Sequence, residues 1–190
     1  MYNVTKQRKS PDQIKHQNIK EHGLKKLLLS LMVLTLTVGT LACQPDSGKT
    51  TTPDNNLEGS LESLLERIYQ DTNLDESFRE YTKTGLYTTE IPTDRVAYYL
   101  GKEDIEFEEG IASEPIMSPG AYSLCLIRVK EGTNIAQIKK DIAENVDPMK
   151  WICVGVDPSN VIVDSIGDVV FLLMSNQETQ NLHNAFLALK

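Results

Sequence analysis

One stretch of this chain, from Leu24 to Cys43, decides which residues are left to form a folded domain. Lys25 and Lys26 precede an apolar run, Leu27 to Val38, and small residues follow within Gly39 to Ala42. A basic region, an apolar core of about 7 to 15 residues and small residues at the cleavage point make up a secretory signal. The apolar run is shorter than the ~20 residues that span a bilayer. We therefore expect a cleaved signal and no transmembrane helix here.

The end of this signal resembles the lipobox of bacterial lipoproteins, in which an aliphatic residue, a small residue or two and an obligatory cysteine stand in order. Leu41, Ala42 and Cys43 match that pattern. The resemblance implies that residues 1–42 are removed and that Cys43 carries a thioether-linked diacylglycerol, with palmitate as a typical acyl chain. Two acyl chains, at about 0.8 kcal/mol per buried CH₂, anchor a protein stably. It implies a lipoprotein on the extracellular face of the cell membrane.

The residues before Leu24 are unusual for a secretory signal, because Met1 to Gly23 is long, polar and rich in Lys, Gln and Asn. One hypothesis is that translation starts near residue 24, at the Leu24 codon read as methionine if it is UUG. A peptide from within Met1 to Lys20, found in cells by mass spectrometry, would contradict this start.

Charge is distributed unevenly about Cys43. The whole chain has a net charge of −8, but 7 of its 19 basic residues and only 2 of its 27 acidic residues precede Cys43. The chain from Cys43 onward therefore carries 12 basic and 25 acidic side chains, a net charge of −13. Such a surface repels nucleic acid and anionic lipid, so we expect neither as a partner. Cations, basic peptides and neutral ligands stay open.

Composition divides the rest of the chain into a linker and a domain. Residues 43–56 contain the lipidated cysteine followed by Ser, Thr, Gly, Pro, Asp and Asn, a composition that favours a disordered tether. Residues 57–190 are long enough to bury the core of one ordinary domain without disulfides or metals.

Apolar periodicity within residues 57–190 predicts both helices and strands. Helices are expected from Leu57 to about Asp71, over 133–146 and over 177–189. Strands are expected at 103–109, 121–129, 151–156, 161–163 and 169–174. Residues 75–91 favour a helical turn and then an extended piece, 95–100 fit helix or strand, and 111–120 favour an irregular connection. This order predicts a single α+β domain with helices packed on a mainly antiparallel sheet.

The succession of core segments also resembles a known family. The segments are Ala121 to Lys130, Thr133 to Val146, Trp151 to Val154 and Gly167 to Val170 with the apolar strand after it. They are similar to the uncharacterised lipoproteins of clostridial Firmicutes whose domain after the linker has no known function. The resemblance covers about Leu61 to Lys190 and implies the outer face of a single-membrane envelope. It carries over no functional residues.

Two cysteines follow Cys43, and each lies in an apolar segment, Cys125 in 124–127 and Cys153 in 151–154. Two buried free thiols are the first interpretation, since a buried cysteine behaves as a small hydrophobe. A disulfide between neighbouring strands is the alternative that an exported location permits. A catalytic cysteine is disfavoured, because His183 is the only histidine after Cys43 that could activate it.

Residues 57–190 contain no catalytic or metal-binding motif that we recognise, so we expect no catalytic residue, no metal and no cofactor. His183 is interpreted as a solvated residue of the last helix. Asp157, Asp164 and Asp168 lie in or beside predicted turns, where aspartate ordinarily caps. The acidic run Glu103 to Glu109 lacks the spacing of a calcium loop and favours a solvated face.

Taken together, these features predict a non-catalytic binding or assembly module of the cell envelope, with an envelope protein or a small ligand as partner. The residues behind this expectation are five tyrosines, because tyrosine gives amphipathic contact area at interfaces. They are Tyr81, Tyr87, Tyr98, Tyr99 and Tyr122. The alternative is an envelope hydrolase, in which carboxylates from Asp157, Asp164 or the 103–109 run converge across a cleft.

Overall fold

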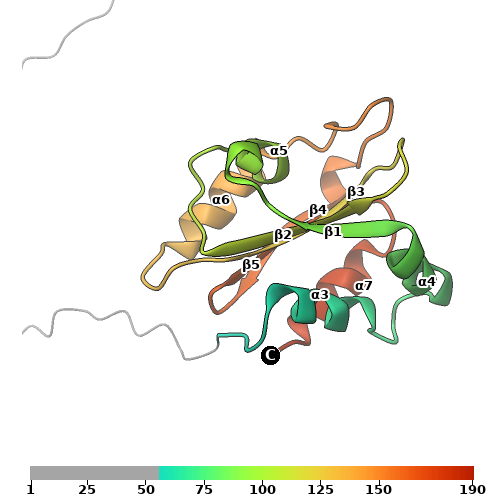
Figure 1. Cartoon of the computed structure of the whole chain (residues 1–190), viewed down its shortest axis with the longest axis horizontal. Coiled ribbons are helices and arrows are strands. Elements are labelled where there is room, and N and C mark those ends of the chain that lie inside the picture. The colour runs from blue at the N-terminus through green and yellow to red at the C-terminus, as the bar shows by residue number, and fades with distance from the viewer. Residues whose placement is uncertain (1–55) are drawn as a thin grey trace, which may run out of the picture. The chain divides into compact units, whose positions relative to one another are not determined.

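A computed structural model describes residues 56–190, which form one five-stranded sheet with helices against both of its faces (Figure 1). The strand order is β1-β2-β3-β5-β4, and every neighbouring pair is antiparallel. The predicted class, a single α+β domain with helices on an antiparallel sheet, is confirmed. The signal, the lipobox residues Leu41 and Ala42, the acceptor Cys43 and the linker up to Asn55 lie outside the described residues.

The strands alternate direction between two ends of the sheet. Their bounds are β1 Leu86–Glu90, β2 Glu109–Pro115, β3 Tyr122–Arg128, β4 Val161–Ile166 and β5 Val169–Ser175. The two central strands β3 and β5 are buried almost throughout, because helices cover both of their faces. Such strands have near-continuous apolar sequences, which is why the two of them were correctly predicted.

One face of the sheet packs against three helices, α3 Leu61–Tyr69, α4 Glu76–Thr84 and α7 Thr179–Leu187. In α3 and α7 the apolar residues recur at helical spacing and form one buried stripe against the sheet, whereas α4 buries only Phe78. Phe171 of β5 stacks on Phe186 of α7 with ring centroids 4.6 Å apart, and both side chains are fully buried.

The other face packs against α5 Val96–Leu100, which follows the 3₁₀ turn Thr93–Arg95, and against α6 Ile135–Asn145. The segment 95–100, for which the sequence allowed helix or strand, is therefore helical. Gly101, at φ +85°, ends α5 in the left-handed conformation that glycine adopts without strain. Asn134 caps α6 by accepting a hydrogen bond from the N–H of Gln137, near the start of the helix expected over 133–146.

The first helix begins later than predicted. Ser60 is its N-cap, and the Ser60 hydroxyl accepts a hydrogen bond from the N–H of Ser63. Gly59 before it takes φ +96°, which turns the chain so that Leu57 is buried ahead of the helix. The apolar spacing therefore extends one turn beyond the helix itself.

The predicted strand at 103–109 is wrong. Most of that segment is irregular, and β2 instead occupies Glu109–Pro115, where we expected an irregular connection. β2 is buried on both faces although it contains Gly110, Ser113 and Glu114. Small and polar residues mask this strand in the sequence, because the helices on either side supply the bulk.

The predicted strand at 151–156 is also wrong, since most of that segment is an exposed loop before the 3₁₀ turn Pro158–Asn160. Ile152 is 77% exposed, and Cys153 has φ 63°. β4 begins at Val161 as predicted but continues to Ile166, so Asp164 lies in a strand and only Gly167 and Asp168 form the turn to β5.

Candidate functional site

In the part of the chain that the structure describes, the exposed large apolar side chains come from segments at one end of the sheet. Within residues 56–190 six such side chains are exposed, and we call them the apolar end: Tyr81, Tyr87, Ile116, Met117, Met149 and Ile152. They come from α4, the start of β1, the β2–β3 loop and the loop after α6, which lie together in Figure 1. Met117 and Ile152 are each 77% exposed, so these are not edges of the core.

A pocket of about 550 Å³ opens among these segments. Tyr81 and Phe78 of α4 line one side, Pro115 and Gly120 flank it at the β2–β3 loop, and Gly155 comes from the loop after α6. The Met149 side chain packs against Gly155, which connects the exposed methionine to the pocket wall. Tyr81 and Met149 thus connect the apolar end to the pocket.

Most polar groups that line the pocket are bonded within the protein. The Asn176 amide oxygen accepts from the N–H of Asp157, and its nitrogen donates to the carbonyl of Gly155. The Ser175 hydroxyl donates to the carbonyl of Gln177, and the Tyr122 hydroxyl lies 2.9 Å from that of Tyr69. A pocket whose polar atoms are already paired favours an apolar group in its interior.

A buried ion pair lies beneath the loop after α6. Lys150 Nζ is 2.8 Å from Glu114 Oε1, and their side chains are 5% and 7% exposed. Lys150 Nζ also lies 4.2 Å from the centre of the Tyr98 ring and 5.1 Å from that of Trp151, within cation–π range. The loop after α6, which exposes Met149 and Ile152, is thereby attached to the sheet through Lys150.

The same buried environment perturbs a tyrosine. Burial, followed by the charge of the neighbouring Glu114 carboxylate, raises the pKa of Tyr98 to about 12. Its hydroxyl donates a 3.4 Å hydrogen bond to Glu114 Oε2, so this phenol serves as a neutral donor to a buried carboxylate. The arrangement ties the half-buried Tyr98 to the ion pair that positions the loop.

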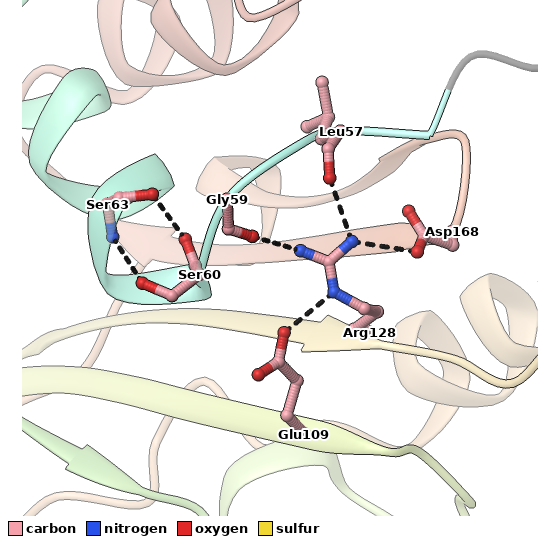
Figure 2. Close-up of polar contacts among 7 residues, drawn as sticks. All are labelled: Leu57, Gly59, Ser60, Ser63, Glu109, Arg128 and Asp168. Atoms are coloured by element: carbon pink, nitrogen blue, oxygen red, sulfur yellow. Dashed lines mark hydrogen bonds and ion pairs between the residues drawn. The ribbon is translucent and has the colours of Figure 1, made fainter.

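The opposite end of the strands holds the start of the described chain. Arg128, at the end of β3, donates to the carbonyls of Leu57 and Gly59 and to the carboxylates of Glu109 and Asp168 (Figure 2). The four distances run from 2.7 to 3.0 Å, and the Arg128 side chain is 16% exposed. One guanidinium therefore joins β2, β3, the β4–β5 turn and the segment before α3.

The prediction that His183 is a solvated helix residue is wrong. Its Nε2 lies 2.8 Å from Asp164 Oδ2, its ring stacks on Phe171, and its side chain is only 18% exposed. Lys139 Nζ lies 3.0 Å from the other Asp164 oxygen. Burial raises the Asp164 pKa, but the hydrogen bonds from His183 and Lys139 outweigh it and lower that pKa to about 2. Asp164 thus joins helices from both faces at the β4 edge.

The remaining candidate aspartates have structural contacts. Asp157 caps the 3₁₀ turn by accepting from Ser159, which agrees with the predicted turn role. Asp168 pairs with Arg128 in the β4–β5 turn. The Asp164 carboxylate faces a lysine and a histidine. Among residues 56–190, no group of three or more His, Cys, Asp or Glu side chains is placed to hold a metal ion.

The two cysteines of the domain differ from the first interpretation, which buried both. Cys125 in β3 is buried, whereas Cys153 is exposed, and both thiols are free. Burial raises the pKa of Cys125 to about 11, which disfavours its thiolate. The apolar neighbours of Cys153 in sequence suggested a strand, but Lys150 holds this part of the loop outside the core.

Tyrosines alone were an incomplete guide to the exposed surface. Tyr81 and Tyr87 belong to the apolar end, but Tyr99 and Tyr122 are buried and Tyr98 packs around Lys150. Ile116 and Met117 were missed, although the sequence holds a signal for them. They are large apolar residues in an uncharged stretch bounded by Pro115 and Pro119. For this stretch the expectation of a loop was correct.

None of the helices in residues 56–190 is long and apolar enough to cross a membrane. In comparisons with known proteins, no family model, no curated protein and no solved structure matches this chain.

Proposed function

We propose that this protein is a lipoprotein, anchored through Cys43 on the extracellular face of the cell membrane, whose domain binds a protein partner of the cell envelope. The binding surface is the apolar end with its pocket. One observation carries the proposal, namely that the six exposed large apolar side chains of residues 56–190 come from α4, β1 and the two loops at one end of the sheet, where α4 and the same two loops also supply residues to the 550 Å³ pocket. Contiguous exposed apolar surface on a soluble domain marks interaction sites.

Composition supports a protein partner over a small ligand. The exposed methionines and isoleucines extend beyond the pocket, farther than a ligand enclosed in it would need. Residues 116–120 contain no charge, and the single charge in 149–155 is the buried, paired Lys150. Loss of charge and enrichment in Tyr and Met distinguish the centres of protein interfaces, where methionine also adapts its shape.

Topology supports the same surface. The described chain begins at the end of the strands where Arg128 binds the carbonyl of Leu57, and the segments of the apolar end lie at the other end (Figure 1). A tether that joins the domain at the Arg128 end leaves the apolar end available to a partner. The satisfied polar atoms of the pocket favour an apolar or aromatic anchor residue from that partner.

Anchoring is tested by labelling the full chain in cells with a radioactive or alkyne-tagged palmitate. We expect label in the wild type and in Cys153→Ser, and none in Cys43→Ser, which also leaves the membrane fraction. Equal labelling of Cys43→Ser would contradict the anchor without bearing on the binding surface.

Binding is tested with a photo-reactive amino acid placed at Met117 or Ile152 of the full chain in cells. We expect both positions to crosslink the same partner, and Lys140, which is 61% exposed on α6, not to crosslink it. Met117→Glu and Ile152→Glu should abolish recovery of that partner while leaving the unfolding temperature unchanged. Crosslinks that differ from site to site, or recovery that survives both substitutions, would overturn the proposal.

A further inference from the structure

The sheet has one open edge, at β1. The N–H of Ile91 bonds to the carbonyl of Gly110, and the carbonyl of Gly85 accepts from the N–H of Ile116. In an antiparallel ladder the residues that bond to a given neighbour alternate. The odd-numbered residues of β1 thus bond to β2, and the main-chain N–H and C=O groups of Leu86 and Thr88 face away from the sheet. Among residues 56–190, β1 pairs with β2 only.

The other edge of the sheet is protected. Helix α6 packs along β4, and Asp164 of β4 binds both Lys139 of α6 and His183 of α7. Edge strands are ordinarily covered or charged in this way, because open edges pair with other chains. Nothing in residues 56–190 covers β1 in a comparable way, and Tyr87, Thr88 and Glu90 are exposed.

A groove of about 350 Å³ lies beside this open edge, between α3 and α4. Leu65 and Tyr69 supply its apolar surface, and Thr88 of β1 forms its border. Thr88 and Leu86 share one face of β1, because side chains alternate along a strand. A strand added next to β1 would therefore place every second side chain in the groove.

The groove has an uncompensated negative charge. Glu62 and Glu66 line it, and within residues 56–190 neither forms an ion pair. Lys83 also lines the groove, but it pairs with Glu80 at 3.4 Å. A lysine or arginine side chain fits these walls, since its aliphatic stem packs on apolar surface while its charged head stays near carboxylates.

We propose that β1 accepts an extended basic segment of a partner protein as a sixth, antiparallel strand, with lysine or arginine side chains in the groove between α3 and α4. Main-chain hydrogen bonds would supply affinity, and the alternate basic side chains would supply specificity. This surface adjoins the apolar end at Tyr87 of β1, but it consists of the main-chain edge of β1 and the groove between α3 and α4, so the inference does not depend on the function proposed above.

The probe is a blocked eight-residue peptide of alternating threonine and lysine, titrated into the purified full-length chain by fluorescence anisotropy. Two further peptides are N-methylated, one on its lysine amides and one on its threonine amides. In an antiparallel pair, residues opposite Leu86 and Thr88 share both their face and their hydrogen bonding. N-methylation of the main-chain amides of the lysines should therefore weaken binding at least tenfold. N-methylation of the main-chain amides of the threonines should weaken it less than threefold. Equal binding of the methylated peptides, or no binding of the parent, would overturn the proposal.

Charge is tested by matched variants. Glu62→Gln with Glu66→Gln should weaken binding of the parent peptide at least tenfold. Glu103→Gln with Glu106→Gln removes the same charge from exposed positions outside the groove and should change binding less than threefold. If both pairs weaken binding equally, attraction is to the acidic surface in general and the groove is not the site. The unfolding temperatures of the wild type and the two double variants should agree, since all four substituted side chains are exposed.

Discussion

Lys150 Nζ lies 2.8 Å from Glu114 Oε1, and both side chains are more than nine-tenths buried. Glu114 belongs to β2, whereas Lys150 belongs to a loop that has no helix or strand of its own. The pair therefore connects the irregular part of the apolar end to the rigid sheet. Its burial makes each charge dependent on the other, because an isolated charge in the interior is strongly unfavourable.

Replacement of Lys150 should strongly destabilise the domain. Lys150→Met leaves the Glu114 carboxylate buried without its partner, which should lower the free energy of unfolding by about 3 to 5 kcal/mol. Addition of Glu114→Gln to Lys150→Met should restore part of that loss. Urea unfolding measures both changes, and hydrogen exchange at residues 151–154 should rise in Lys150→Met. Lys140→Met on the exposed face of α6 is the control, with an expected change below about 0.5 kcal/mol.

Asp164 should give the domain an acid-dependent stability. Its folded pKa of about 2 is below the 3.8 of an unperturbed aspartate, so its contribution is complete above pH 4 and is lost as pH falls from 3.8 to 2. With 29% of its side chain exposed, the contribution is on the order of 1 to 2 kcal/mol. Asp164→Asn should be less stable than wild type by that amount at pH 6, and the difference should shrink toward pH 2. Asp104→Asn, at a 72% exposed position, should show no such trend.

The sequence predicted the elements whose own residues contain the pattern. β3 and β5 are continuous apolar runs, and α6 and α7 have apolar residues at helical spacing with a polar opposite face. Such elements are recognisable because burial and periodicity are properties of the segment itself. β2 was missed, since its burial depends on helices far away in sequence, and its Glu114 requires the later Lys150.

The exposed residues of the apolar end and the contacts of Asp164 were predictable only in part, because they too depend on residues distant in sequence. The segment around Ile152 and Cys153 resembles a buried strand, and only the anchoring of Lys150 in the core explains why these neighbours are exposed. Asp164 and His183 are 19 residues apart and meet only when β4 and α7 pack together. Contacts of this kind depend on tertiary packing and leave no local signal.

Arg128 should control the order of the segment that leads into α3. Arg128→Lys replaces a planar guanidinium, which reaches four acceptors, by one ammonium group that cannot span them. We expect a loss of about 2 kcal/mol in the free energy of unfolding and faster hydrogen exchange at residues 59–61. Arg67→Lys, on the exposed face of α3, is the matched control and should change neither quantity. Unchanged exchange in Arg128→Lys would contradict the clamp.

The two thiols of the domain should react at very different rates. Cys125 is 1% exposed and its burial raises its pKa to about 11, whereas Cys153 is exposed in the loop after α6. Thiolate is the reactive form, so a buried thiol of high pKa is inert until the domain unfolds. In the chain with Cys43→Ser, a thiol reagent at pH 8 should modify one cysteine in the native state and a second in urea. Cys153→Ser should abolish the native reaction and Cys125→Ser should leave it intact. Native modification of both cysteines would show that β3 opens, and modification of neither would show that Cys153 is covered in solution.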